Sequence, residues 1–271
     1  MHTLYVVATP IGNLEDISLR AQRILKDVRL IAAEDTRKTG YLLKHYHIST
    51  PMTSYYEHNK LIKINYILDC LEKGDVALVS EAGMPGISDP GYELIAAAIK
   101  TGINVVPIPG ASIVTVALAV SGLPTDKFSF LGFLPNKPTN RRQALKGVTA
   151  EKNTLLCLEA PHRLQASLKD ILSILGDRRI AVCRELTKLH EEIFRGTVSE
   201  AIGHFTKPKG EFALVIEGHR EEKQLQLNNE IEEKLRKLYL SGVSAKEAVG
   251  TVAAETGLSK RKLYRAWLEQ I

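Results

Sequence analysis

The first 122 residues alternate short apolar runs with longer amphipathic segments. The apolar runs show no polar alternation and predict strands buried on both faces, at 4–8, 29–33, 75–79 and 103–107. Helical spacing of apolar residues follows each run, at 18–26, 36–45, 61–72, 90–100 and 111–120. Strands that are each followed by a helix predict a parallel sheet with helices on both faces.

A second set of apolar segments follows Gly122 and Pro124, which punctuate the chain and predict a domain boundary. Strands are predicted at 128–133, 154–158, 180–184, 192–197 and 212–217, with a helix at 162–175. More of these strands are adjacent in sequence than in the first half. The second half is therefore expected to form a mixed sheet.

Polar and charged residues at 219–226 predict a linker, and the chain after them has helical patterns only. A helix is expected at 228–239, and Ser244 with Glu247 has the spacing of a capping box that begins a second helix. Ser259 is expected to cap a third helix. The fold class expected is therefore α/β, with domains at 1–122 and 123–220 and a helix-turn-helix-like tail at 221–271.

Charge and composition change this picture little. The formal net charge of +5 favours an anionic partner, nucleic acid first. The apolar run from Ile113 to Val120 is far shorter than the roughly 20 residues of a membrane-spanning helix, and no secretion signal precedes the first strand. A soluble, cytoplasmic protein with no membrane partner is expected. No histidine or cysteine spacing supports a metal site.

Glycine- and proline-rich loops follow three predicted strands, at Thr9–Leu14, Ser80–Gly91 and Pro107–Ser112. Ligands of open α/β sheets bind outside the carboxyl ends of the strands, where these loops would meet. The alternative interpretation is that these loops are three ordinary turns with no ligand. That interpretation is weaker for three such loops together than it would be for a single loop. The loops thus predict a shared ligand crevice.

Charged residues form three further candidate sites. Glu34, Asp35 and Arg37 follow the second strand, as either a helix cap with a solvated ion pair or groups facing the crevice. A basic stretch is either a solvated face or a phosphate-binding surface, and it contains Lys137, Arg141, Arg142 and Lys146. The last helix is basic too and serves either nucleic-acid binding or packing, with Lys260, Arg261, Lys262 and Arg265 beside Tyr264 and Trp267.

Eight segments in order resemble the ribosomal RNA methyltransferases of the tetrapyrrole methylase superfamily: Leu4–Leu14, Ala33–Arg37, Ser80–Gly91, Pro107–Gly110, Gly132–Pro135, Pro161–Arg163, Arg184–Lys188 and Lys209–Glu211. The helical tail is similar to the C-terminal extension of the same family. Two positions depart from the family pattern, since Glu81 stands where the family has Asp and Met84 where it has Thr.

The resemblance implies two α/β domains with S-adenosylmethionine in the cleft between them, a homodimer, and no metal. It implies 2′-O-methylation of a cytidine in the decoding region of 16S rRNA, within the small ribosomal subunit. On this basis the cofactor is expected at Pro10, Gly12, Ser80, Glu81, Gly83, Ser112, Leu158, Glu159 and Pro161.

A base is useful because a ribose hydroxyl is a poor nucleophile until its proton is leaving. Asp35 or Glu34 is the hypothesis for that base, with Arg37 holding the adjacent phosphate. RNA phosphates are expected at Lys137, Arg141, Arg142 and the basic tail. Two rival functions stay open: a methyltransferase of the same fold acting on a small molecule or protein, and a ligand-sensing regulator that binds nucleic acid.

Overall fold

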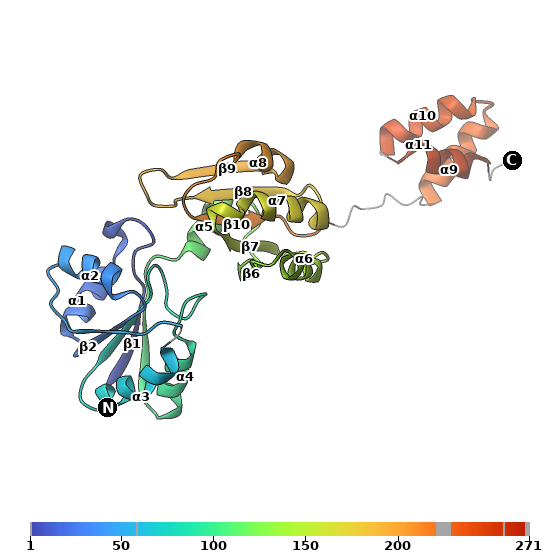
Figure 1. Ribbon diagram of the computed structural model, residues 1–271. Helices are drawn as coiled ribbons and strands as arrows, with labels where there is room; N and C mark the ends of the chain where they lie inside the picture. The colour runs from blue at the N-terminus through green and yellow to red at the C-terminus, as the bar shows by residue number, and fades with distance from the viewer. Residues whose placement is uncertain (1, 58, 221–228, 257, 269–271) are drawn as a thin grey trace. The chain divides into compact units, whose positions relative to one another are not determined.

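A computed structural model describes residues 2–57, 59–220, 229–256 and 258–268 of the chain. The chain divides into two compact units, Met1–His219 and Arg220–Ile271 (Figure 1). Most of the predicted linker at 219–226 lies outside the described residues. None of the described helices combines the length and apolarity needed to cross a bilayer.

The first sheet is entirely parallel, as predicted, with strand order β3-β2-β4-β1-β5. Its strands are β1 (Thr3–Val7), β2 (Leu30–Ala33), β3 (Met52–Ser54), β4 (Val76–Val79) and β5 (Asn104–Ile108). All residues of β2 and β4 are buried, which explains their continuous apolar sequence. The short edge strand β3 was not predicted.

Helices cover both faces of this sheet. Helices α1 (Leu19–Asp27) and α2 (Thr36–His45) pack on one face, and α3 (Lys60–Leu71) and α4 (Tyr92–Lys100) on the other. A short 3-10 helix, η1 (Leu14–Asp16), precedes α1. Because helices cover both faces, only the ends of the strands and the loops that follow them are open to a ligand.

The second sheet is mixed, as predicted, with strand order β6-β7-β10-β8-β9. Only β6 and β7 pair in parallel. The strands are β6 (Phe128–Phe133), β7 (Thr154–Glu159), β8 (Arg179–Arg184), β9 (Glu192–Thr197) and β10 (Phe212–Ile216). One face carries α6 (Pro138–Gly147), α7 (Pro161–Leu175) and α8 (Val198–His204).

The other face of the second sheet is covered by α5 (Ile113–Ser121), which precedes the predicted domain boundary. Ala117 and Leu118 of α5 pack against Leu156 and Val215 of that sheet. Gly122 ends α5 in the left-handed conformation, with φ of 74°, a common helix terminus. A domain boundary at Gly122 stays a prediction, and it would separate α5 from the sheet that it covers.

The tail consists of α9 (Asn229–Leu240), α10 (Ala245–Thr256) and α11 (Lys260–Leu268). Ser244 and Ser259 accept backbone hydrogen bonds at the starts of α10 and α11, as predicted. The helices enclose a small core around Leu235, Val252 and Trp267. The tail is therefore a compact three-helix unit.

Candidate active site

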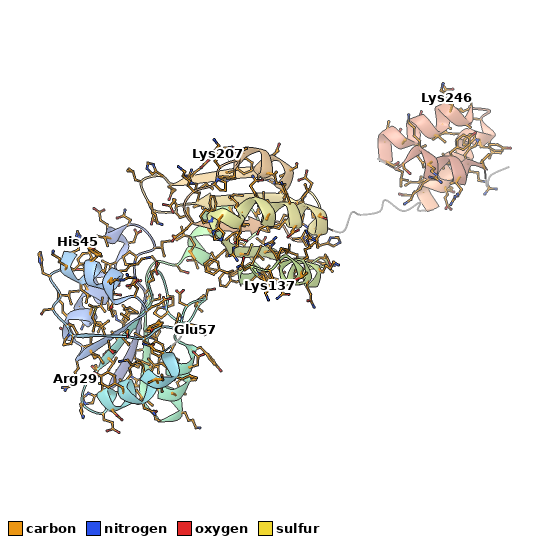
Figure 2. The ribbon with its side chains drawn as sticks, viewed as in Figure 1. Arg29, His45, Glu57, Lys137, Lys207 and Lys246 are labelled. Carbon is orange, nitrogen blue, oxygen red and sulfur yellow. The ribbon has the colours of Figure 1, made fainter. Side chains whose placement is uncertain are left out.

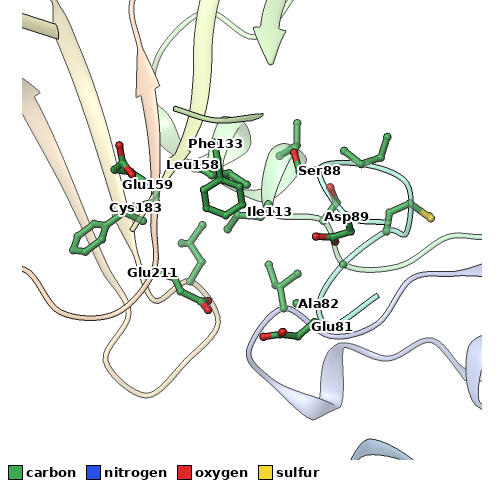
Figure 3. Close-up of a pocket in the computed structure, with 18 of the residues that line it drawn as sticks. Glu81, Ala82, Ser88, Asp89, Ile113, Phe133, Leu158, Glu159, Cys183 and Glu211 are labelled. Carbon is green, nitrogen blue, oxygen red and sulfur yellow. The ribbon is translucent and has the colours of Figure 1, made fainter. Parts of the chain in front are cut away.

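A pocket of about 380 Å³ lies between the loops of the first sheet and the strand ends of the second (Figure 3). This volume is within the range typical of small-molecule sites. One wall is formed by the loops of the first sheet and the start of α5. Its residues are Ile11, Glu34, Glu81, Ala82, Gly83, Met84, Ile87, Ser88, Asp89 and Ser112–Val114. The other wall contains Phe130, Phe133, Leu158–Pro161, Cys183, Leu186, Glu211 and Phe212.

The wall formed by the loops of the first sheet contains three acidic residues, Glu34, Glu81 and Asp89. The Glu81 backbone N–H donates to Glu34 Oε2 at 3.0 Å, and the Glu81 carboxylate is paired with Lys38. The pKa of Asp89 is raised to about 7, first by burial and then by the negative charges of Glu34 and Glu81. A hydrogen bond with Ser80 acts in the opposite direction and limits this rise.

The loop that carries these acids is held by backbone contacts. Gly83 pairs with Thr9 through two hydrogen bonds, of 2.9 and 3.0 Å, and has φ of 79°. Ser80 is buried behind the loop, where its hydroxyl donates to the Gly83 carbonyl at 3.3 Å. Ser80 was predicted to contact the cofactor, but it does not line the pocket and instead stabilises the loop. Ser88 has φ of 66°, an uncommon conformation for a side-chain-bearing residue, directly before Asp89.

The first glycine loop contributes one residue to the pocket lining. Neither Pro10 nor Gly12 lines the pocket, and Ile11 between them does. A Cβ at Gly12 would lie 2.5 Å from Lys188 Cγ and 2.7 Å from Thr187 Oγ1. Gly12 therefore allows the loop after β8 to approach closely, and its contact with the cofactor stays a prediction.

The wall formed by the second sheet is mostly apolar, with Phe133 and Leu158 facing the cavity (Figure 3). Glu159 lines the pocket, but its carboxylate is already occupied. It pairs with Arg163 at 2.7 Å, accepts from the Ala160 N–H at 2.8 Å, and accepts from the Ser167 hydroxyl. Glu159 thus anchors the start of α7, as a buried charge must be paired.

Of the predicted catalytic groups, only Glu34 lines the pocket. Asp35 caps α2 and accepts from the backbone N–H groups of Arg37 at 2.8 Å and Lys38 at 3.3 Å. The Arg37 guanidinium also bonds the Asp35 carboxylate, and these hydrogen bonds lower the pKa of Asp35 to about 2. The geometry of Asp35 and Arg37 is the helix cap with an ion pair that the sequence left open as an alternative.

Asp89 is one of the pocket residues that sequence reasoning missed. It stands inside the Ser80–Gly91 loop that the sequence analysis identified, next to several glycines and prolines. The signal that distinguishes it is the proximity of Glu34, which comes from a different strand end. No local sequence pattern contains that information.

The basic stretch forms helix α6, which was not predicted. The structure contradicts one phosphate contact expected in this stretch, that of Arg141. Arg141 is buried and pairs with Asp170 of α7 at 2.6 Å, so it is not available to hold an RNA phosphate. Arg142 also contacts Asp170, at 2.8 Å, but its side chain is 60% exposed. Lys137 and Lys146 are exposed, and Lys137 lies at the start of α6 (Figure 2). The exposed surface of α6 therefore keeps its positive charge without Arg141.

The basic residues of the last helix lie on the outside of the tail. Leu263, Ala266 and Trp267 face the core, which leaves the opposite side of α11 to the cations. These exposed residues are Lys260, Arg261, Lys262 and Arg265. One face of this helix thus serves packing, and nucleic-acid binding by its exposed cations stays a prediction.

The sequence and the fold have counterparts among known proteins. Residues 3–202 match the family described as tetrapyrrole (corrin/porphyrin) methylases, and residues 229–270 match the RsmI C-terminal HTH domain. The chain therefore belongs to the tetrapyrrole methylase family, a class of methyltransferases. Two solved structures share its fold. Uroporphyrin-III-C-methyltransferase from Thermus thermophilus is 19% identical, with a TM-score of 0.57 over 79% of this chain and 94% of that chain. Diphthine synthase is 15% identical, with a TM-score of 0.61 over 80% of this chain and 91% of that chain.

The particular relatives are each named ribosomal RNA small subunit methyltransferase I. The protein of Halalkalibacterium halodurans is 48% identical over 99% of this chain and 95% of its own length. That of Synechocystis is 48% identical over 99% and 98%. The protein of Thermotoga maritima is 51% identical over 80% of this chain and 99% of its own length. At this identity and coverage the chain is a member of the same branch of the family.

Proposed function

We propose that this protein transfers a methyl group from S-adenosylmethionine to the 2′-hydroxyl of a cytidine in the decoding region of 16S rRNA. The observation that carries the proposal is the pocket, which joins a carboxylate wall and an apolar wall in a chain 48% identical to a named ribosomal RNA methyltransferase. A homodimer in the cytoplasm is expected with this function.

The residues of the pocket fit the chemistry of the methyl donor. Its adenine base is flat with aromatic faces, which suits the apolar surface of Phe130, Phe133 and Leu158. Its sulfonium and ammonium groups are cationic, which suits the opposite wall with Glu34, Glu81 and Asp89. When bound, the donor supplies a methyl group activated by a positive sulfur.

The protein's own contribution is to position the reactants, exclude water and accept a proton. The apolar wall keeps the pocket dry and strengthens electrostatic interactions there. Alignment of the hydroxyl oxygen with the methyl carbon and sulfur supplies much of the rate enhancement. Glu34 is the proposed proton acceptor, since it lines the pocket and Asp35 does not. The oxygen–carbon bond forms, the carbon–sulfur bond breaks, and the hydroxyl proton passes to the Glu34 carboxylate.

The RNA is proposed to bind through exposed cations on both units. Lys137 and Arg142 present charge on α6, and the outer face of α11 presents more. Such groups hold phosphates without reading sequence. The choice of nucleotide is then made by the pocket and the shape of the rRNA around it.

The test uses small ribosomal subunits from a strain that lacks this enzyme, incubated with protein and isotopically labelled S-adenosylmethionine. Nuclease digestion and mass spectrometry locate the label, which we expect on the ribose of a cytidine. Glu34→Gln should slow the transfer by about 100-fold or more, the usual contribution of a general base, while Asp35→Asn retains most activity. Donor binding without label on RNA would refute the proposed substrate and favour a small-molecule or protein acceptor.

A further inference from the structure

The charges of the pocket are unbalanced. Glu81 is paired with Lys38, and Glu211 on the opposite wall is paired with Lys188 at 2.9 Å. Asp89 faces Glu34 and Glu81 and has no lysine or arginine partner among the described residues. Glu34 accepts the Glu81 backbone N–H but has no such partner either, so two carboxyl groups of the acidic wall lack a compensating cation among the described residues, and Asp89 is the one whose pKa is raised.

The surroundings of Asp89 favour its protonated form. It is half-buried beside an apolar surface, and the two neighbouring carboxylates repel a third negative charge. The Ser80 hydroxyl is the one neutral group that acts in the other direction. A cation placed in the pocket would reverse this balance, because it attracts the ionised form.

The methyl donor and its product differ in that property. S-adenosylmethionine carries a positive charge at sulfur, and S-adenosylhomocysteine has a neutral thioether there, while the rest of the two molecules matches. A carboxylate near the sulfur therefore acts on the donor and leaves the product almost unaffected.

We propose that Asp89 distinguishes donor from product, ionising when the sulfonium binds and taking up a proton again when that charge is lost. The inference rests on the proposed function, since it assumes that the pocket holds this donor. Donor binding releases one proton from Asp89 to solvent. Once the methyl group has left, the neutral product no longer stabilises the ionised carboxyl, which weakens its hold on the pocket.

Isothermal titration of the full-length protein with each molecule at pH 6 and pH 8 tests the proposal. With the free-protein pKa of Asp89 near 7, about a tenth of the protein is ionised there at pH 6 and about nine tenths at pH 8. The donor should thus bind about tenfold more tightly at pH 8, and the product equally at both pH values. Repeating the pH 6 titration in buffers of different ionisation enthalpy should show proton release for the donor only.

Three variants locate the effect. Asp89→Asn should bind the donor equally at both pH values and more weakly than the wild type does at pH 6, and it should bind the product normally, which shows that the pocket is intact. Asp89→Glu should restore a pH dependence. Glu211→Gln removes a carboxylate from the opposite wall and should leave the tenfold pH effect in place.

Two results would overturn the inference: a tenfold pH effect that persists in Asp89→Asn, or one of equal size for the product. Failure of the proposed function is a different result, in which the wild type binds neither molecule at any pH. Product that binds at both pH values while the donor shows no pH effect would leave the methyl-transfer proposal standing and refute the role of Asp89.

Discussion

Asp170 and Asp89 are carboxylates in two regions of the protein with opposite electrostatic surroundings. Burial acts to raise the pKa of Asp170, but hydrogen bonds from Arg142 and Arg141 outweigh it and lower that pKa. Burial raises the pKa of Asp89, and Glu34 and Glu81 add to the rise. The paired carboxylate joins α6 to α7, and the unpaired one lines a pocket.

The contrast separates charges that stabilise the fold from charges kept for a ligand. A buried ion pair satisfies itself and holds its two elements together. A carboxyl whose charge is opposed by its neighbours costs stability, and such groups gather at functional sites. The same distinction applies to the cations, since Arg141 is buried in a pair and the outer face of α11 is exposed to solvent.

The largest expected effect comes from breaking the buried pair. Arg141→Met keeps most of the side-chain volume and removes the charge, and it should lower the free energy of unfolding by about 3–5 kcal/mol. Arg142→Gln is the matched control, because it removes the exposed partner of the same carboxylate and should cost less than about 1 kcal/mol. Urea denaturation measures both, and equal losses would contradict the division between a structural and an exposed arginine.

A smaller effect with the opposite sign is expected at Asp89. Its pKa in the folded protein, about 7, exceeds the ordinary value of 3.8, so the folded state holds the proton more tightly than the unfolded state. The stability of the wild type should therefore fall as pH rises from about 4 to about 7, and the full penalty should be present above pH 7.

Asp89→Asn removes this penalty. Allowing for solvent screening at a half-exposed site, the variant should be more stable than the wild type by about 1–2 kcal/mol at pH 8, with a difference that vanishes near pH 4. Urea denaturation across this range checks the sign. Asp170→Asn should be destabilising at pH 8, and the comparison between the two regions fails if both variants shift in the same direction.

The smallest effect is expected for single cations of the tail. Arg261→Gln should weaken binding of a small-subunit rRNA fragment only a few-fold, and should lower the slope of log affinity against log salt by about 0.7–0.9. Lys246→Gln, on the exposed surface of α10, is the matched control and should leave the slope unchanged. Filter binding between 50 and 200 mM salt is suitable for the measurement. Equal slopes for Arg261→Gln and the wild type would remove Arg261 from the RNA surface.

Much of the fold could be predicted because its signals are local. The buried strands β2 and β4 are continuous apolar runs, and the helix starts at Ser244 and Ser259 have cap residues at the usual spacing. Helix α6 was missed because a buried arginine occupies its inner face, so its sequence lacks an apolar stripe. Strand β3 has three residues and an exposed Met52, which gives too little pattern to detect.

The candidate site was predicted in part. The sequence placed Glu81, Gly83 and Ser112 in loops at strand ends, and these residues line the pocket. It also placed Pro10, Gly12 and Ser80 there, and none of these three is among the lining residues. Glycine and proline show where a chain turns, but they do not show which side of the turn faces a ligand.

Sequence alone determined that one sheet is parallel and the other mixed, and it determined the helical tail and the family, because periodicity, caps and ordered motifs depend on residues close together in the chain. Tertiary structure decided which charges are paired. Arg141 meets Asp170 only because α6 packs on α7, and Asp89 meets Glu34 only because β2 and β4 are neighbours in the sheet. Electrostatic energy depends on distance in space and on burial, and neither is a property of sequence spacing.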